Sequence, residues 1–297
     1  MIMRKDIFAT GIIMTMMTFA SCSTDEVNGN SPISVRETPI NIVATHPSAT
    51  RATATDFEEG DKIGLYVAGE KDELELSGNL VNNEPITLSS NTWTGRRTLY
   101  WDEGKYNAYA YYPYQMIESI EDQPFGVATD QTTAKAADRP GGYEASDLLY
   151  AITAGVEAGK EPIALRFKHM MSRITIRLVK GEDFEGDMPR DAEIFIHNTI
   201  TSATIDLTAG IATREAKGAR KTIKARQEGD HSFGAIVVPQ RIDNRMPLIE
   251  VVMKGVSYLF ESKFVFKTGV NHLVNLVITT NPEQALIKIG GETEKWE

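Results

Sequence analysis

Cysteine is almost absent from this chain, because Cys22 is the only one among 297 residues. A single thiol cannot form an intramolecular disulfide, so packing and hydrogen bonds must hold the fold together. Motifs for catalysis are absent as well: no histidine lies within four residues of another, and there is no G-x-S-x-G elbow, phosphate loop or G-x-G-x-x-G turn. The sequence therefore predicts a protein that is not an enzyme and needs no cofactor. A carboxylate pair assembled by the fold is the alternative left open.

Positive charge is also scarce. The chain has 31 Lys and Arg residues against 41 Asp and Glu residues, a formal net charge of −10 at pH 7. An acidic surface repels phosphates, so nucleic acid and anionic membrane surfaces are not expected partners.

A long apolar run is missing too, although a short one is present at the N-terminus. Arg4 and Lys5 precede residues 7–20, an apolar stretch of 14 residues in a chain where a membrane span needs about 20. Small residues, Ala20 and Ser21, then stand directly before Cys22. This arrangement predicts a lipoprotein signal peptide over residues 1–21, lipid such as palmitate on Cys22, and anchoring at the outer membrane. The alternatives are a transmembrane anchor, or an ordinary cleaved signal followed by a chance cysteine.

Helical periodicity of any length is absent from the remainder. Residues 22–38 are polar and predict a flexible tether. From there, short runs with period-two alternation are separated by turn residues, which predicts antiparallel β-sandwiches. Gly and Pro flank a change of pattern over residues 159–162, so we expect an N-terminal β-sandwich domain over 39–160 and a C-terminal one over 161–297. Residues 115–147 are long and polar, which indicates one or two loops with short strands.

The clearest alternation lies in the second half. Ile163, Leu165 and Phe167 alternate with polar residues, and further strands are expected over 174–178, 192–197, 204–207, 234–238, 248–253, 258–266 and 272–279. Lys254-Gly255 predicts a tight hairpin turn between two of them.

Several short motifs follow one another along the chain. They are Thr50-Arg51-Ala52, Phe57-x-x-Gly60-Asp61-x-Ile63-Gly64-Leu65, Trp93, Tyr106-x-Ala108-Tyr109-Ala110-Tyr111-Tyr112-Pro113, Asp130-Gln131, Ser146-Asp147-Leu148-Leu149-Tyr150-Ala151, Phe167-x-His169-x-x-Ser172-x-Ile174, Thr268-Gly269-x-Asn271 and Trp296. Together with the lipoprotein start, they resemble the fimbrillin-like family, the subunits of type V pili. The resemblance implies an all-β protein with two transthyretin-like, Greek-key sandwich domains. It also implies a role in the fimbrium at the cell surface, with other pilus subunits as partners.

The resemblance further implies proteolytic processing after an arginine, followed by strand exchange between subunits. Arg51, with Ala52 as the new N-terminus, is the preferred site because it stands in a run of small polar residues; Arg36 is the alternative. Ile40, Ile42 and Ala44 form one apolar row, and Ala285, Ile287 and Ile289 form another of similar size. The two rows are candidates to fill one groove in turn. The alternative is that both are ordinary paired strands of their own sandwiches.

Other functions remain open at this point. The chain could stay a monomeric surface lipoprotein that binds a glycan or a host protein through residues 115–147, or it could be an uncut pilus anchor. Asp183, Glu185, Asp187 and Asp191 could bind Ca²⁺ but lack the spacing of a calcium loop, which favours a solvated hairpin. Tyr106, Tyr109, Tyr111 and Tyr112 could stack on sugars, although aromatics on a strand more often pack in a core.

Overall fold

The computed structural model describes residues 35–47, 57–136, 139–280, 286–288 and 293–296. The expected signal peptide and Cys22 lie outside these ranges, as do Arg51 and Ala52. Within them, no helix is long and apolar enough to cross a membrane.

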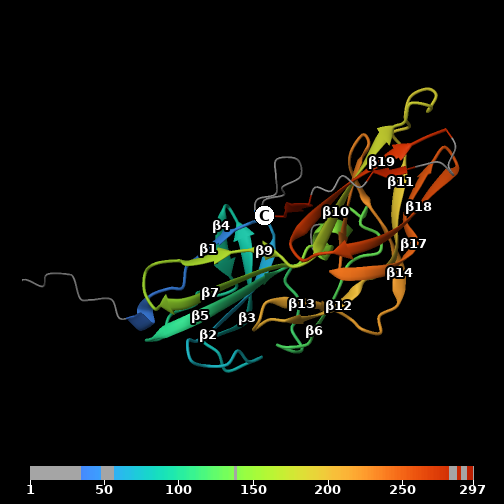
Figure 1. The fold of residues 1–297 in the computed structure, drawn as a ribbon. Coiled ribbons are helices and arrows are strands. Elements are labelled where there is room, and N and C mark those ends of the chain that lie inside the picture. Colours follow the sequence, from blue (N-terminus) through green and yellow to red (C-terminus); the bar gives the residue numbers. More distant parts are fainter. Residues whose placement is uncertain (1–34, 48–56, 137–138, 281–285, 289–292, 297) are drawn as a thin grey trace, which may run out of the picture. The chain divides into compact units, whose positions relative to one another are not determined.

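Strands make up nearly all of the regular secondary structure in the described chain (Figure 1), which confirms the all-β fold class. Two short helical turns interrupt them, the 3-10 turn η1 (Val35–Glu37) and the helix α1 (Gly142–Ser146). The strands before residue 170 are β1 (Ile42–Thr45), β2 (Lys62–Gly69), β3 (Val81–Ser89), β4 (Thr92–Gly95), β5 (Lys105–Tyr112), β6 (Gln123–Gly126), β7 (Leu149–Glu157), β8 (Ile163–Arg166) and β9 (Lys168–His169). Those after it are β10 (Ser172–Lys180), β11 (Glu193–Ile200), β12 (Ser202–Asp206), β13 (Ile211–Arg214), β14 (Arg220–Lys224), β15 (Arg226–Gly229), β16 (Ser232–Val237), β17 (Gln240–Met253), β18 (Val256–Phe266), β19 (Val270–Ile278), β20 (Leu286–Lys288) and β21 (Thr293–Lys295).

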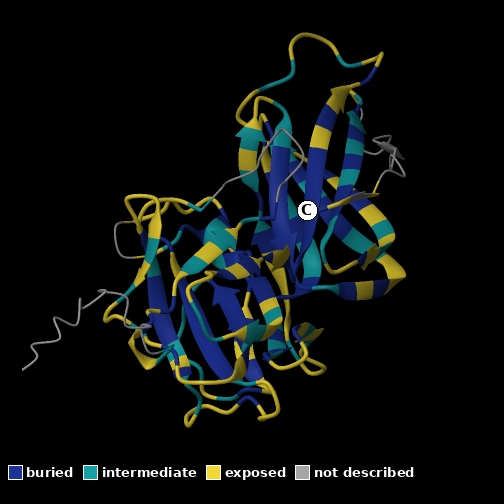
Figure 2. Ribbon diagram, turned by 90° about the vertical axis from the view of Figure 1, so that its left-hand side faces the viewer, coloured by how far each residue is buried: buried dark blue, intermediate teal, exposed yellow. Residues whose placement is uncertain are grey.

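The first half builds a six-stranded antiparallel sheet in the order β4-β3-β2-β5-β7-β9, and β1 pairs with β8 in a separate two-stranded parallel sheet. An apolar cluster joins these two sheets, with Ile63 and Leu65 from β2 packed with Leu165 from β8. Alternation explains the arrangement, because every second residue of such a strand points to the same face. Figure 2 shows the resulting stripes, with buried residues along the strands and exposed ones at the turns.

The second half builds two larger sheets. One has the order β15-β16-β10-β19-β20, with β21 also paired to β19, and the other has the order β14-β11-β17-β18. A three-stranded sheet, β13-β12-β6, brings β6 from the 115–147 segment against β12. Short strand structure within 115–147 is thus confirmed.

The predicted boundary at residues 160/161 falls before β8 and β9, which both pair with strands of the first half. Ile163 lies opposite Ile42, and His169 lies opposite Leu149. A second apolar cluster also combines Tyr66 and Tyr109 of the first half with residues of the second. The division into two sandwich domains therefore stays a prediction, and strand pairing would put the end of the first one at His169.

Two local details follow directly from residue chemistry. Lys254 and Gly255 have φ values of 49° and 73°, as a two-residue type I′ turn requires, and this confirms the predicted hairpin. At Gly64, a Cβ atom would lie 2.3 Å from Cζ of Tyr111, so only glycine allows the tyrosine ring to lie flat over β2. The rings of Tyr106, Tyr109, Tyr111 and Tyr112 are all buried, as core packing requires.

Candidate functional site: the first strand and its slot

The segment 38–45 is bonded by its backbone to two other parts of the chain. On one side, the Ile40 N–H donates to the Leu99 carbonyl at 2.8 Å, and the Trp101 N–H donates to the Thr38 carbonyl at 3.1 Å. These are antiparallel contacts, and Pro39 lies opposite Tyr100 between them.

On the other side, β1 runs parallel to β8, in register from Ile42–Ile163 to Thr45–Arg166. The Ile163 N–H donates to the Asn41 carbonyl at 2.8 Å, and the Phe167 N–H donates to the Thr45 carbonyl at 3.1 Å. Residues 99–101 and 163–167 are the backbone walls of what we call the β1 slot. All of these bonds use main-chain groups, so any sequence without proline at the bonding positions could form them.

Side chains of the segment 38–45 also enter the core between the two sheets. Ile40 is 8% exposed, and Ile42 and Ala44 are half-buried against the same apolar cluster. Val43, on the opposite face, is 52% exposed. The predicted row of Ile40, Ile42 and Ala44 therefore faces the core, where its burial is worth about 4 kcal/mol gross.

The arginines proposed for processing have different positions. Arg36 lies on the exposed turn η1, where its Nε is 2.8 Å from Oδ1 of Asp102. Arg51 and Ala52 lie outside the described residues, between Pro47 and Phe57. The described ends of that interval are close together, since the rings of His46 and Phe57 meet edge-on at 4.9 Å.

The C-terminal row is only partly described. Ala285 and Ile289 lie outside the described residues, and Ile287 lies on β20 opposite Leu276 of β19. β21 continues along β19, with Lys295 opposite Val270. The described residues of both candidate rows therefore belong to segments that pair within their own chain.

Residues 127–147 are held very differently from β1. The Gln131 side chain is fully buried and bonds the backbone of β16 twice: its Oε1 accepts from the Ile236 N–H at 2.8 Å, and its Nε2 donates to the Ile236 carbonyl at 2.7 Å. Its amide thus takes the place of a strand residue. The Ser146 Oγ accepts from the Ala128 N–H at 2.9 Å and donates to the Gly142 carbonyl at 2.7 Å.

The remaining motif residues continue this packing toward the end of the chain. The Asp147 Oδ1 lies 2.7 Å from Nδ1 of the buried His169. His169 stacks on Trp296 with ring centroids 3.6 Å apart, and the Trp296 N–H donates to the Gly269 carbonyl at 2.9 Å. The motif residues on this path therefore have structural roles.

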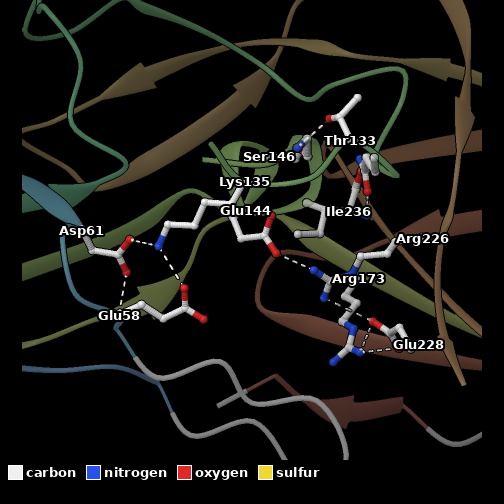
Figure 3. Close-up of polar contacts among 12 residues, drawn as sticks. Glu58, Asp61, Thr133, Lys135, Glu144, Ser146, Arg173, Arg226, Glu228 and Ile236 are labelled. Carbon is white, nitrogen blue, oxygen red and sulfur yellow. Dashed lines mark hydrogen bonds and ion pairs between the residues drawn. The ribbon is translucent and has the colours of Figure 1, made fainter. Parts of the chain in front are cut away.

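Ion pairs also attach this segment to its surroundings (Figure 3). The Lys135 Nζ donates to Glu58 at 2.9 Å and to the buried Asp61 at 3.0 Å. Burial lowers the pKa of Lys135, but the hydrogen bonds to Glu58 and Asp61 outweigh this effect, and the net shift is upward. Lys135 therefore stays charged at neutral pH.

A second set of charges lies under α1. Arg226 pairs with Glu144 and lies over the ring of Tyr143, with Cζ 3.7 Å from the ring centroid. The buried Arg173 donates from Nη2 to both carboxylate oxygens of Glu228, each at 2.8 Å. Figure 3 shows the two arginines side by side. These contacts fix α1 against β15 and β16, so much of residues 115–147 is built into the fold rather than displayed as a binding loop.

Two alternatives from the sequence can now be placed. The acidic stretch with Asp183, Glu185, Asp187 and Asp191 belongs to the turn between β10 and β11. Among the described residues, no three His, Cys, Asp or Glu side chains converge to hold a metal ion. The sugar-stacking interpretation needs exposed rings, whereas the four tyrosines are buried.

Sequence reasoning missed the walls of the β1 slot. Residues 99–101 carry no alternating pattern that predicts a strand, and the pattern of residues 163–167 groups them with the strands that follow. A polar residue such as Gln131, beside a run of turn residues, gives no sign in the sequence that it is buried.

Known proteins resemble this chain in sequence and in fold. A protein of Bacteroides ovatus named as a candidate fimbrium tip subunit, Fim1C, is 31% identical over 178 residues, which are 54% of this chain and 32% of the relative. The chain thus spans about a third of that relative's length.

Solved structures of two candidate cell adhesion proteins resemble this one. The protein from Bacteroides ovatus has a TM-score of 0.68 at 17% identity, and the one from Bacteroides uniformis has 0.66 at 20% identity; each comparison covers 87% of this chain and 98% of the other. A fimbrial protein from Bacteroides vulgatus has a TM-score of 0.51 at 16% identity, covering 87% of this chain and 99% of that one. These likenesses show a shared fold. The sequence model described as fimbrillin-like matches residues 50–296, so this chain belongs to the fimbrillin-like family.

Proposed function

We propose that this chain is a fimbrial subunit or tip adhesin at the cell surface, exported as an outer-membrane lipoprotein through Cys22, processed after Arg51 and assembled by strand exchange. The observation that carries the proposal is the β1 slot. Its occupant is held by main-chain hydrogen bonds and one row of small aliphatic side chains, all of which a strand from another subunit can supply.

Removal of β1 would leave a groove with a defined chemistry. The Trp101, Ile163 and Phe167 N–H groups and the Leu99 carbonyl would lose their partners. The apolar cluster under Ile40 would be opened to water. Both effects favour a new strand in the same place, since unpaired buried backbone groups cost about 1–3 kcal/mol each.

Cleavage after Arg51 is suited to this release, whereas cleavage after Arg36 is not. Arg51 follows β1, so a cut there separates the whole segment 38–45 from the rest of the chain. Arg36 precedes Thr38, so a cut there would remove the lipid-bearing segment and leave β1 in its slot. The family match begins at residue 50, which places β1 before the matched range.

The donor is expected to be a C-terminal segment of a neighbouring subunit, for which Ala285, Ile287 and Ile289 are the candidate row. That segment would have to leave β19, to which three described residue pairs join β20. It would also have to run parallel to β8, as β1 does.

A second candidate is a subunit that keeps its lipid and remains uncut, either as a pilus anchor or as a monomeric surface lipoprotein that binds a glycan or host protein. The pairing of β1 within its own chain favours this second candidate, because an uncut chain needs no donor.

The test compares two arginine variants in the native cell. N-terminal mass is measured in sheared surface fractions from cells that carry wild-type protein, Arg51→Ala or Arg36→Ala, with an unboiled denaturing gel beside it. We expect a start at Ala52 and stable multimers for the wild type and for Arg36→Ala, and a lipidated monomer for Arg51→Ala. Multimers of normal stability from Arg51→Ala would exclude processing at that site.

A second measurement tests the slot itself. After cleavage, the protein should bind a labelled peptide with the sequence of residues 38–46, and uncut protein should not. The control peptide carries Ile40→Ser and Ile42→Ser, which keep the backbone but remove the apolar row. Equal binding of both peptides would show that the slot does not select the row.

A further inference from the structure

The edge of the C-terminal sheet carries an unusually regular strand. β18 has 11 residues and pairs with β17 on one side. Among the described residues, no strand pairs with its other side. The bulges in the β17–β18 ladder arise from extra residues on β17, so β18 itself is continuous from Val256 to Phe266. A long, regular edge strand is a template for pairing with another chain.

Its side chains alternate without a break. Tyr258, Phe260 and Phe266 face the core, and the other face presents an exposed row. That row is Ser257, Leu259, Glu261, Lys263 and Val265. Leu259 is 51% exposed and Val265 is 40% exposed, which is a large apolar exposure for an edge strand.

The turn at Lys254 and Gly255 fixes which backbone groups are available. A two-residue turn makes Met253 and Val256 a hydrogen-bonded pair, so Val256 and every second residue after it bond to β17. The N–H and C=O groups of the exposed row therefore point to the open side.

We propose that β18 pairs antiparallel with β18 of a second copy of this chain, about a two-fold axis at Ser262. In this register Glu261 lies opposite Lys263 of the other copy, and Leu259 lies opposite Val265. Two-fold symmetry makes each contact twice. Opposite charges and paired aliphatic residues are the cross-strand combinations that stabilise a ladder.

Shifting the two-fold axis to a neighbouring residue gives unfavourable cross-strand pairs. An axis at Glu261 or at Lys263 places like charges directly opposite each other, and an axis at Phe260 places Leu259 opposite Glu261. Glu261 makes an exposed ion pair within the chain, in which its Oε2 is 3.6 Å from Nε of Arg245. Such pairs are weak, so they do not prevent a new contact.

This contact is independent of processing and of the β1 slot, since β18 belongs to another sheet and pairs with neither wall of the slot. It would join two four-stranded sheets into one continuous sheet. In a fimbrium it would link subunits side by side rather than end to end.

The first test is a disulfide placed on the axis, in a Cys22→Ser background that leaves the introduced thiol as the only one. In a non-hydrogen-bonded pair the two Cα atoms lie about 4.5 Å apart, which is within the range for a disulfide. We expect Ser262→Cys to form a covalent dimer on a non-reducing gel. The control is Ser257→Cys on the same strand, whose two copies would lie about 34 Å apart, and its dimer yield should be at least ten-fold lower.

The second test reverses charges and uses sedimentation velocity over a concentration series. Glu261→Lys should abolish the dimer, and Glu261→Lys with Lys263→Glu should restore it, because the opposite charges then face each other again. Both side chains are exposed, so circular dichroism should be unchanged. Equal cross-linking by the two cysteine variants, a mixed disulfide with a different protein in place of the self-dimer, or failure of the double reversal to restore the dimer would each overturn the proposal.

Discussion

Residues 38–45 and residues 127–147 both connect parts of this fold, yet they are held by opposite kinds of contact. The first segment depends on main-chain bonds and a short aliphatic row. The second depends on particular side chains, such as the Gln131 amide that bonds both backbone groups of Ile236. Generic contacts can be reproduced by another strand, whereas side-chain-specific contacts cannot. The proposed strand exchange requires contacts of the first kind, and residues 38–45 have them.

The largest effect is expected from Gln131→Ala, which tests whether particular side chains hold residues 127–147. It leaves the Ile236 N–H and carbonyl buried without partners, so we expect a loss of about 3 kcal/mol in the free energy of unfolding. The measurement is denaturant unfolding. The matched control is Thr132→Ala at the neighbouring exposed position, expected to cost less than about 1 kcal/mol. A similar loss from both variants would contradict the role of the Gln131 amide.

Acid should weaken the fold at β19, which belongs to neither segment. The His272 Nε2 accepts the Lys267 N–H at 3.2 Å, and burial lowers the pKa of His272 from 6.5 to about 4. The unfolded chain therefore binds a proton at a higher pH than the folded one, and stability present above pH 6.5 is lost as the pH falls toward 4. The loss is about 2–3 kcal/mol.

Residues 38–45 contain no titratable side chain, so β1 should stay paired over this range. The check is the free energy of unfolding between pH 7 and 4 for the wild type and for His272→Gln, whose profile should be flatter. An unchanged slope in that variant would assign the acid sensitivity to other groups.

Ile40→Ala tests the contribution of the aliphatic row to holding residues 38–45. Truncation of this buried side chain should cost about 2 kcal/mol, while Val43→Ala on the opposite face of the same strand should cost less than about 0.5 kcal/mol. Denaturant unfolding of the uncut protein gives both values. Equal losses from the two variants would contradict the role of the apolar row in holding this segment in its slot.

The smallest effect is expected at the entrance to β1. Arg36→Ala removes an exposed ion pair with Asp102, so the free energy of unfolding should change by less than about 0.5 kcal/mol. A larger loss, measured in the same way, would show that η1 clamps the first strand and that the segment is less replaceable than its contacts indicate.

Local sequence patterns predict many of the strands and one hairpin turn, because these features depend on neighbouring residues. Alternation along residues 174–178 or 258–266 reflects a face that must be buried whatever it packs against, so the strands could be read directly. The hairpin at Lys254 and Gly255 could also be predicted, because two residues with positive φ are a local requirement.

Pairing partners could not be predicted in the same way. The parallel contact between Ile42 and Ile163 joins residues that are far apart in sequence, and nothing in either strand encodes the other. Residues 163–167 were therefore assigned to the second domain. The buried Gln131 and the helix α1 were missed because polar, turn-rich sequence has the same composition in an exposed loop.

The covalent link between Pro47 and Phe57 gives the first strand a large advantage over any competitor. While the link is intact, β1 competes for its slot at an effective concentration in the millimolar range, as short tethers generally provide. A donor strand at micromolar concentration would then be outcompeted by about a thousand-fold. In the proposed assembly, hydrolysis of one peptide bond would remove that advantage without altering any contact in the slot. The outcome of the competition would then depend on the concentrations of the two strands rather than on a change in affinity.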